Sequence, residues 1–367
     1  MKPLLFVTGH APAYRVGALT RLHEREGIEL ALFGGRYKHG GDGFEGDMPF
    51  PHRYVRPHEL YALAAGGGYR AVVCPTGGRL APLATWSGAR RARVPLILWA
   101  SLWAHPRSAA HALSYLPLRR MYRKADAVVT YGSHVSSYVQ SRGARNVFVA
   151  PQSVDNDFWS DSQTAPPSRR AWPADADVRF LFVGRDAPEK GVAVLLDAWR
   201  HAALATPSNA LVLVGTGSGR ASFAPSGLRR SGDDGIFSLD ALAPAELRDV
   251  YAACDVLVVP SIPTPTFREP WALVVNEAMN RGMPVIASDA VGAAAGGLVR
   301  NDLNGIVVPA GDSVALAAAM QRLAGDGALR ARLGEQAATD VRAYNHDAWA
   351  QGFCEALASL GLARGRW

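Results

Sequence analysis

Short apolar runs alternate with longer amphipathic segments along this chain, and that alternation restricts the folds open to it. In the first part of the chain the apolar runs have the length and composition of strands, and the amphipathic segments have helical spacing. Such alternation predicts βαβ units around a parallel sheet. The expected strands lie at residues 2–7, 29–33, 71–74, 96–99 and 127–130, and the expected helices at 17–26, 85–92, 118–124 and 133–141.

Composition changes between Pro151 and Pro173, where Pro, Ser and Asp predominate as they do in interdomain linkers. Beyond this segment the alternation resumes, with strands expected at 178–183, 210–214, 256–259, 285–287 and 305–308 and helices at 192–201, 244–253, 273–281 and 313–324. A chain of 367 residues suits two domains. We expect an α/β protein with a first domain at 1–155, a linker at 156–172 and a second domain at 173–344, with a helix at about 345–367 packing back on the first domain.

The formal net charge of +7 comes partly from two basic clusters, at residues 90–93 and 119–124. A solvated surface is one interpretation of these clusters, and an anionic membrane surface or an anionic substrate is another. The sequence contains no zinc-ligand spacing and no basic–aromatic RNA-binding motif, so we expect no nucleic acid partner.

The three cysteines, Cys74, Cys254 and Cys354, are scattered and odd in number. They predict neither a disulfide framework nor a metal cluster, and they suit a reducing compartment. The apolar start is too short for a signal peptide and is interpreted as the first strand. The chain also lacks an apolar run of about 18 residues, which a membrane-spanning helix would need. We therefore expect a cytoplasmic protein, which could also associate with the inner face of the membrane.

In open parallel sheets ligands bind beyond the carboxyl ends of the strands, so we look for a site where the strands of the second domain end. The first such segment begins at Gly184, which ends a strand, and carries Arg185 and Lys190 before the next helix. Two cations at such a turn suit a pyrophosphate. The arginine guanidinium can donate two parallel hydrogen bonds, and the lysine ammonium acts as a point charge. The alternative is a surface loop whose cations pair with Asp186 and Glu189.

The second segment is glycine-rich. Gly215 and Gly217 follow a strand, and backbone at glycines can approach a phosphate or a sugar closely. The segment is not a dinucleotide fingerprint, because the G-x-G-x-x-G frame from Gly215 ends on Arg220 and the frame from Gly217 ends on Ser222. A plain tight turn is the alternative.

The third segment follows the strand at 256–259 and contains two glutamates eight residues apart, Glu269 and Glu277. Pro270 suits the first position of a helix, so the amides of residues 271–274 would form an anion site at its N-terminus. Glu277 would lie about two turns further along the same side. Carboxylates accept hydroxyl donors in pairs, as sugars present them. An ordinary solvated helix face is the alternative.

Six segments of the second half occur together: VGRDAPEKG, VLVGTGSG, LRDVYAACDVLVVPS, EPWALVVNE, AMNRGMPVIASDAVG and NDLNGIVVPAGD. In this combination they resemble the retaining glycosyltransferases of GT-B fold and family 4, the glycosyl transferases group 1. The resemblance covers about residues 180–335, nearly the whole second domain. It implies two Rossmann-like parallel-sheet domains that face a central cleft, with the sugar donor on the second domain and the acceptor on the first.

The resemblance also implies roles for single residues. Arg185 and Lys190 would bind the donor's diphosphate and stabilise the leaving nucleotide. Glu269 would hold hydroxyls of the sugar, and Glu277 would hold the ribose. The donor would further contact Gly184, Gly215, Gly217, Ser238, Leu239, Trp271, Ala272, Leu273 and Val274, with Ser238 and Leu239 beside the base. Ala272 departs from the family, which commonly has glycine there, and its methyl group would tighten the sugar pocket.

The first domain matches the family less closely. Family members often carry a histidine after a central strand, and Ser101 occupies that position here. His105 follows four residues later, either as a catalytic replacement that contacts the sugar or the acceptor, or as a capping or surface histidine. His10 and Arg15 follow the first strand, where the family has a Gly-Gly loop, and are expected on the acceptor side.

Together these features predict a metal-independent, hexosyl-type glycosyltransferase. It would move a sugar from a nucleotide diphosphate sugar to a hydroxyl of a glycan, a lipid-linked molecule or a natural product. Among such donors we expect a UDP- or GDP-sugar first. No cofactor and no metal site are expected, because the DxD-like triplets at 155–157 and 175–177 stand in turn-like surroundings. An epimerase or phosphorylase of the same architecture and an inactive nucleotide-sugar-binding protein are the alternatives.

Overall fold

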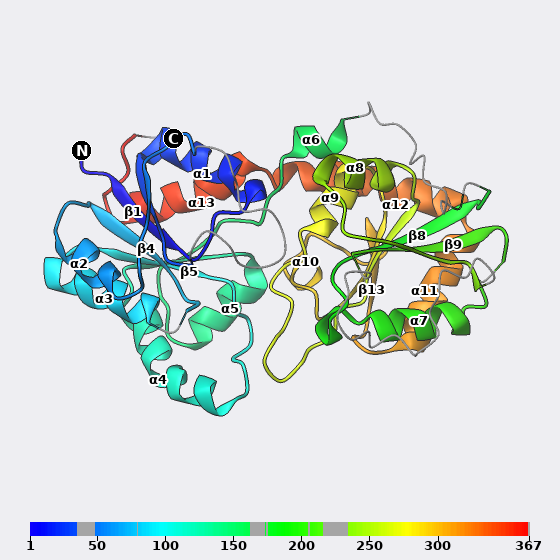
Figure 1. The fold of residues 1–367 in the computed structure, drawn as a ribbon, viewed down its shortest axis with the longest axis horizontal. Helices are drawn as coiled ribbons and strands as arrows, with labels where there is room; N and C mark the ends of the chain where they lie inside the picture. The colour runs from blue at the N-terminus through cyan, green and yellow to red at the C-terminus, as the bar shows by residue number, and fades with distance from the viewer. Residues whose placement is uncertain are drawn as a thin grey trace. The chain divides into compact units, whose positions relative to one another are not determined.

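The computed structural model describes residues 1–34, 48–78, 80–161, 173, 175–204, 206–215 and 234–365. The chain forms two compact units. Unit 1 comprises Met1–Asp155 and Tyr344–Trp367, and unit 2 comprises Asn156–Ala343. Each unit has a parallel sheet with helices on both of its faces (Figure 1).

Unit 1 is built on a parallel sheet whose strand order, within the described residues, is β3-β2-β1-β4-β5-β6-β7. Its strands are β1 (Leu4–Thr8), β2 (Ile28–Leu32), β3 (His52–Tyr54), β4 (Ala71–Pro75), β5 (Leu96–Ala100), β6 (Ala127–Thr130) and β7 (Val147–Val149). The order reverses between β1 and β4, which makes this pair the switch point of the sheet.

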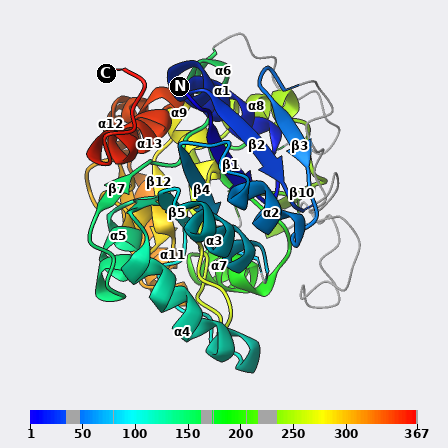
Figure 2. The same ribbon diagram turned by 90° about the vertical axis from the view of Figure 1, so that its left-hand side faces the viewer.

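Helices of unit 1 pack on both faces of this sheet through two apolar clusters. One face carries α1 (Ala13–Glu26) and α13 (His346–Ser359), and the other carries α2 (Glu59–Ala65), α3 (Ala81–Ala92), α4 (Ala109–Lys124) and α5 (Ser133–Ser141). The helix expected at 118–124 is only the end of α4, which reaches farther from the sheet than its neighbours (Figure 1 and Figure 2). α4 starts earlier because Ser108 accepts a hydrogen bond from the amide of His111 as an N-cap.

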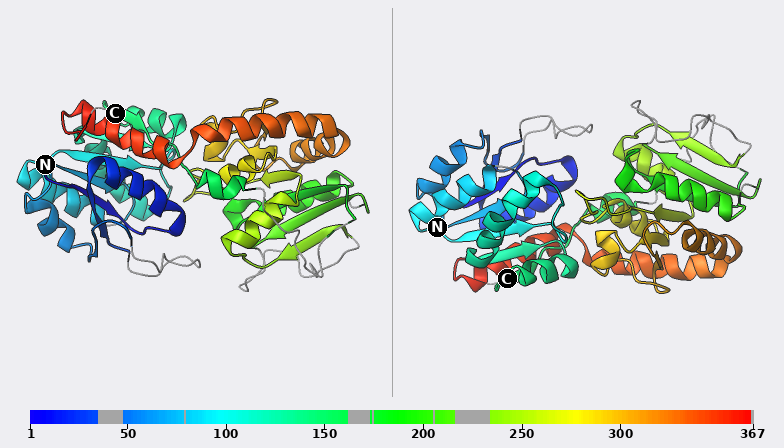
Figure 3. Two further views of the ribbon diagram at one scale, coloured as in Figure 1. Left: turned by 90° about the horizontal axis from the view of Figure 1, so that it is seen from above. Right: turned by 90° about the horizontal axis from the view of Figure 1, so that it is seen from below.

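The C-terminal helix α13 belongs to unit 1 (Figure 3), and Arg364 beyond it donates to the carbonyl oxygen of Met1 at 3.4 Å. Arg25 of α1 pairs with Asp347 of α13, with 2.7 Å between Nη2 and Oδ1. A Cβ atom on Gly352 would fall 2.3 Å from the carbonyl oxygen of Val149. Glycine therefore permits the close approach of α13 to β7.

A buried ion pair ties the chain after α13 to the first strands. Arg70 Nη2 lies 2.5 Å from Glu26 Oε2, and the two side chains are 5% and 0% exposed. Arg70 also donates to the carbonyl oxygens of Lys2 and Leu362, and Glu26 accepts the amide of Arg364. Burial lowers the pKa of Arg70, and the Glu26 carboxylate opposes that shift.

Unit 2 has a second parallel sheet, with the order β10-β9-β8-β11-β12-β13 within the described residues. The strands are β8 (Val178–Val183), β9 (Asn209–Val214), β10 (Ile236–Leu239), β11 (Val256–Val259), β12 (Val285–Ser288) and β13 (Gly305–Val308). The order reverses between β8 and β11, so the switch point of this sheet lies between those strands.

Helices also pack on both faces of the unit 2 sheet. α7 (Val192–His201) and α11 (Ser313–Gly325) share one apolar cluster with it, while α8 (Pro244–Ala252) and α9 (Val274–Asn280) lie on the opposite face (Figure 1). The remaining helical elements are α6 (Asn156–Ser160), η1 (Pro188–Lys190), α10 (Gly292–Ala295), α12 (Gly327–Asp340) and η3 (Val341–Ala343). None of the helices in the described part of the chain has the length and hydropathy needed to cross a bilayer.

The expected linker at 156–172 needs correction at its start. Residues 156–160 form α6, which packs against α9 within unit 2, and Trp159 is 7% exposed there. The physical reason is the ring of Trp159, which stands edge-on to the ring of Tyr251 with centroids 5.6 Å apart. Residues 162–172 lie outside the described part of the chain.

We predict that Glu26→Gln lowers the free energy of unfolding by about 3–5 kcal/mol, because it leaves the Arg70 guanidinium buried beside a neutral group. Glu24→Gln is the matched control, since Glu24 lies on the same helix with its side chain 52% exposed and should change stability by about 0.5 kcal/mol or less. Urea titration followed by circular dichroism measures both variants. Equal, small losses in the two would contradict this account of Arg70.

Candidate functional site

The loops that follow β8 and β11 meet at the switch point of the unit 2 sheet. Lys190 ends the 3-10 turn after β8, and Glu269 lies in the loop after β11. Lys190 Nζ is 2.5 Å from Glu269 Oε2, although the two residues are 79 positions apart in the chain. Ligands of open α/β sheets bind outside the carboxyl ends of the strands at such a point, so this pair marks the candidate site.

Further contacts fix the geometry of this pair. Ser261 is 1% exposed, and its hydroxyl donates to Glu269 Oε2 at 3.5 Å. The amide of Ile262 donates to the carbonyl oxygen of Glu189 at 3.0 Å, which joins the two loops through their backbones. Gly191 has a φ of 69°, and a Cβ there would fall 2.1 Å from the carbonyl oxygen of Pro260. The loops can approach this closely because the position is glycine.

Arg185 stands beside the site on the same loop as Lys190. Its side chain is 74% exposed, and Nη2 lies 3.5 Å from Glu189 Oε1. The surface pairing that the sequence left open as an alternative therefore holds for Arg185 in this structure. Exposed pairs of this kind contribute little stability, so an anionic ligand can replace Glu189 as the partner of the guanidinium.

Four of the expected donor contacts lie along the same edge of the sheet. Gly184 and Gly215 directly follow β8 and β9, and a Cβ on Gly215 would fall 3.0 Å from the carbonyl oxygen of Gly184. Ser238 and Leu239 end β10, where Leu239 pairs with Val214. Gly217 lies outside the described residues.

The helix expected to start at Pro270 starts instead at Val274, and α9 has seven residues. Hydrogen bonds from α10 hold the preceding segment in a non-helical conformation. The amide of Gly292 donates to the carbonyl oxygen of Glu269 at 3.1 Å, and the amide of Ala293 donates to that of Trp271 at 2.9 Å. These tertiary contacts override the local helix signal of the proline.

Two expectations that depended on this helix are therefore wrong. Trp271, Ala272 and Leu273 precede the first helical residue, Val274, so their amides do not open a long helix. Glu269 also precedes α9, so it and Glu277 are not two turns apart on one helix. The two glutamates instead have different partners, Lys190 for Glu269 and the Tyr251 hydroxyl for Glu277.

The segment before α9 is anchored and strained. Trp271 is 3% exposed and its Nε1 donates to Asn276 Oδ1 at 2.8 Å, so its side chain packs inside unit 2. Ala272 has a φ of 75°, in the left-handed region that favours glycine. The departure from the family's glycine therefore places a methyl group where the backbone disfavours one.

Glu277 lies partly buried beneath Tyr251 of α8. The Tyr251 hydroxyl donates to Glu277 Oε2 at 2.8 Å. Burial raises the pKa of Glu277 to about 7, and the hydrogen bond from Tyr251 opposes that shift. The carboxyl group is consequently divided between its neutral and ionised forms near neutral pH.

In unit 1, His10 and Ser101 lie at the carboxyl edge of the sheet. His10 follows β1 at the switch point, packed close to Gly34, and Ser101 follows β5. Ser101 forms a hydrogen bond with Tyr131, whose pKa burial raises to about 12. Both residues lie at the edge of the sheet where ligands of parallel sheets bind.

Arg15 and His105 are placed differently. Arg15 is 5% exposed, and its guanidinium lies 5.5 Å from the ring centre of Trp99 and 5.3 Å from that of Trp349. His105 lies 2.8 Å from the carbonyl oxygen of His111, in the first turn of α4, through its Nε2. Its Nδ1 has no hydrogen-bond partner among the described residues.

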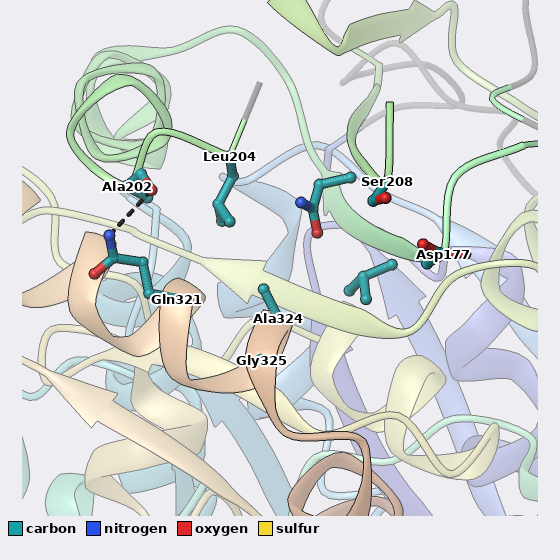
Figure 4. A pocket seen from close by; sticks show the side chains of 9 residues that line it. Asp177, Ala202, Leu204, Ser208, Gln321, Ala324 and Gly325 are labelled. Atoms are coloured by element: carbon teal, nitrogen blue, oxygen red, sulfur yellow. Dashed lines mark hydrogen bonds between the residues drawn. The ribbon is translucent and has the colours of Figure 1, made fainter. Parts of the chain in front are cut away.

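A hollow of about 500 Å³ lies at the opposite, amino edge of the unit 2 sheet (Figure 4). Asp177 and Ser208, just before β8 and β9, line it together with the ends of α7 and α11. Gln321 Nε2 donates to the carbonyl oxygen of Ala202 across one side (Figure 4). Because ligands of such sheets bind at the carboxyl edge, this hollow is not the candidate site.

Within the described residues, no group of three His, Cys, Asp or Glu side chains is arranged to hold a metal ion.

Comparison with known proteins adds the family. The model of the family described as "Glycosyl transferases group 1" matches residues 167–340. A D-inositol 3-phosphate glycosyltransferase from Xylanimonas cellulosilytica is 30% identical over 319 residues, which span 77% of this chain and 70% of that protein. The chain belongs to the glycosyl transferases group 1 family. It is therefore a glycosyltransferase.

A further curated protein and a solved structure are also similar to this chain. A GDP-mannose-dependent alpha-mannosyltransferase from Mycobacterium tuberculosis is 29% identical over 61% of this chain and 56% of its own length. The crystal structure of HepE from Anabaena in complex with UDP and glucose matches with a TM-score of 0.73 at 20% identity, over 98% of this chain and 100% of that one. The glycosyltransferase thus has the GT-B fold that the sequence predicts.

Sequence reasoning missed two residues of the site. Ser261, which donates to Glu269, directly follows a strand and a proline, so its position at the sheet edge was the available signal. Tyr251 lies 26 residues before Glu277 on another helix, and only the folded structure joins them.

We predict that Ala272→Gly raises the free energy of unfolding by roughly 0.5–1.5 kcal/mol, because it relieves a positive φ that costs an L-residue about 1–2 kcal/mol. Ala278→Gly is the matched control in buried α9, and it should lower stability by about 1 kcal/mol or more. Thermal and urea unfolding of both variants measure the difference. A loss of stability in Ala272→Gly would contradict the strain.

We predict that Glu277→Gln is more stable than the wild type at pH 8 and about equal to it at pH 5. A carboxyl group with a raised pKa binds its proton more tightly in the folded state, so its contribution is lost as pH rises through about 7. The variant should gain roughly 1–3 kcal/mol at pH 8. Exposed Glu335→Gln serves as the control for urea titrations at both pH values. A gain independent of pH would rule out this cause.

Proposed function

We propose that unit 2 binds a nucleotide diphosphate sugar at the Lys190–Glu269 pair and that the glycosyltransferase moves its sugar to a hydroxyl acceptor with retention. The observation that carries the proposal is the pair itself. A cation and a nearly buried carboxylate, supplied by the loops after β8 and β11, meet at the switch point of a parallel sheet. An anionic phosphate suits the first group, and sugar hydroxyls suit the second.

The cations would act on the leaving group. Lys190 has three N–H donors and uses one on Glu269, so others remain for phosphate oxygens. Arg185 would exchange Glu189 for the same diphosphate. Two cations would stabilise the charge that develops on the departing nucleotide, and on this ground we propose that transfer needs no metal ion and no cofactor.

The carboxylates would orient the donor. Glu269 is held by Lys190 and Ser261, so it can direct sugar hydroxyls without acting as a nucleophile. Glu277 would accept the ribose hydroxyls in its ionised form. Gly184 and Gly215 would allow close approach of the nucleotide, and Ser238 and Leu239 would lie beside its base.

The comparisons bear on the identity of the donor, and the cysteines bear on the compartment. A GDP-mannose-dependent relative and a neighbour in complex with UDP and glucose favour a GDP- or UDP-hexose as the donor. His10, Ser101 and His105 of unit 1 are proposed on the acceptor side. The thiols of Cys74, Cys254 and Cys354 form no disulfide among the described residues, and we place the reaction in the cytoplasm.

Substitution of the pair tests the proposal. Lys190→Ala and Glu269→Gln should each lower kcat by about 100-fold or more, because each removes a contact to the reacting donor. Arg200→Ala and Glu335→Gln are matched exposed controls on α7 and α12 and should retain full turnover. Release of the free nucleotide in the presence of a hydroxyl acceptor measures all four. Undiminished turnover in Lys190→Ala and Glu269→Gln would remove the site from this position.

A second assay separates transfer from the other activities considered. The protein is incubated with a nucleotide sugar without an acceptor, and the sugar is followed by NMR. We expect slow hydrolysis at most. Epimerisation of the donor sugar without an acceptor would replace the transferase proposal.

A further inference from the structure

Helix α4 presents an exposed apolar and basic face. Leu113 is 82% exposed and Leu116 is 67% exposed. Arg120 and Lys124 follow at spacings of four residues, so they share one side of the helix with the two leucines. We call these four residues, with Arg123, the α4 face. No residue of α4 is acidic.

The opposite side of α4 holds the helix on unit 1. Met121 and Tyr122 are each 1% exposed in the apolar cluster beneath it. Arg142, the C-cap of α5, donates to the Tyr115 hydroxyl at 2.8 Å, and its guanidinium lies 5.3 Å from the centre of that ring. The α4 face is therefore not needed to fix the helix, and two exposed leucines on it are unexplained by the fold.

The leucines lie in the half of α4 nearer the carboxyl edge of the unit 1 sheet. The chain leaves β5 at that edge, passes Ser101 and His105, and enters α4 at Ala109. The bond from His105 to His111 ties this loop to the first turns of the helix. The exposed leucines thus lie on the helix that the chain enters directly from the edge with the proposed acceptor-side residues.

The charges on the α4 face select its occupant. Arg120, Arg123 and Lys124 form no ion pair with a carboxylate among the described residues. A surface that offers leucines at one end and several unpaired cations at the other matches the boundary of a bilayer with anionic head groups.

We propose that the α4 face docks on an anionic lipid surface, with Leu113 and Leu116 at the acyl boundary and the three cations at the head groups. The docking also indicates the class of acceptor, an inference that rests on the proposed function as well. An enzyme held with its acceptor side against a membrane transfers sugar to a lipid-linked hydroxyl. The basic surface of α3, with Arg90 and Arg91 exposed at its last turn, adds to the attraction.

Sedimentation with lipid vesicles tests the docking without any donor or turnover. The full chain is spun with phosphatidylcholine vesicles and with vesicles that contain about 30% phosphatidylglycerol, at low and high salt. We expect binding to the anionic vesicles alone, weakened by salt. Leu113→Gln combined with Leu116→Gln, and Arg120→Gln combined with Lys124→Gln, should each lower the partition coefficient at least tenfold, because glutamine keeps the helix propensity but removes the leucine or the charge.

Val314→Gln and Arg332→Gln are the controls, since Val314 is 67% exposed and both residues lie on helices of unit 2. They should bind as the wild type does. Equal binding to neutral vesicles, no binding at all, or equal loss in the controls would overturn the docking. So would light scattering that shows a dimer dependent on Leu113 and Leu116. Turnover with a soluble acceptor should be unchanged in the leucine variant, so failure of the docking and failure of the transferase proposal are distinguishable.

Discussion

The ion pair between Lys190 and Glu269 is the contact on which the candidate site depends. It joins two loops that leave neighbouring strands at the point where the strand order reverses. A nearly buried ion pair costs desolvation free energy, so it is weak evidence for stability. The proposed function accounts for its position, because a phosphate and a hydroxylated ring would give the two groups further partners. The contact between Lys190 and Glu269 holds the two side chains in place.

Backbone contacts supply the rest of the geometry. Gly191 allows the loop after β8 to touch Pro260, and α10 holds the segment from Glu269 to Trp271 through two amides. Ala272 then takes a positive φ so that the chain can turn into α9. Strain at a site residue is compatible with function when the surrounding contacts fix the conformation. The proposed donor site is thus formed by loops, while the sheet beneath it gives those loops their starting points.

The alternation of apolar and amphipathic segments was enough to predict the parallel sheets, because buried strands in such sheets read as short apolar runs. β3 was not predictable in this way, since His52, Arg53 and Tyr54 are polar and pair only at the edge of the sheet. The predicted start of α9 was wrong for another reason. Pro270 favours a helix locally, but the hydrogen bonds from α10 are tertiary and leave no local signal. Glu269 and Lys190 were predicted separately, whereas their pairing appears only in the fold.

Ligand-induced stabilisation tests the central claim most directly. The thermal unfolding of the wild type and of the Lys190→Ala, Glu269→Gln double variant is followed with UDP-, GDP-, ADP- and TDP-sugars. A true donor at 100-fold its dissociation constant should stabilise the wild type by about 2.7 kcal/mol and leave the double variant almost unchanged. An absence of stabilisation by all of these sugars, or equal stabilisation of both proteins, would contradict a donor site at the Lys190–Glu269 pair.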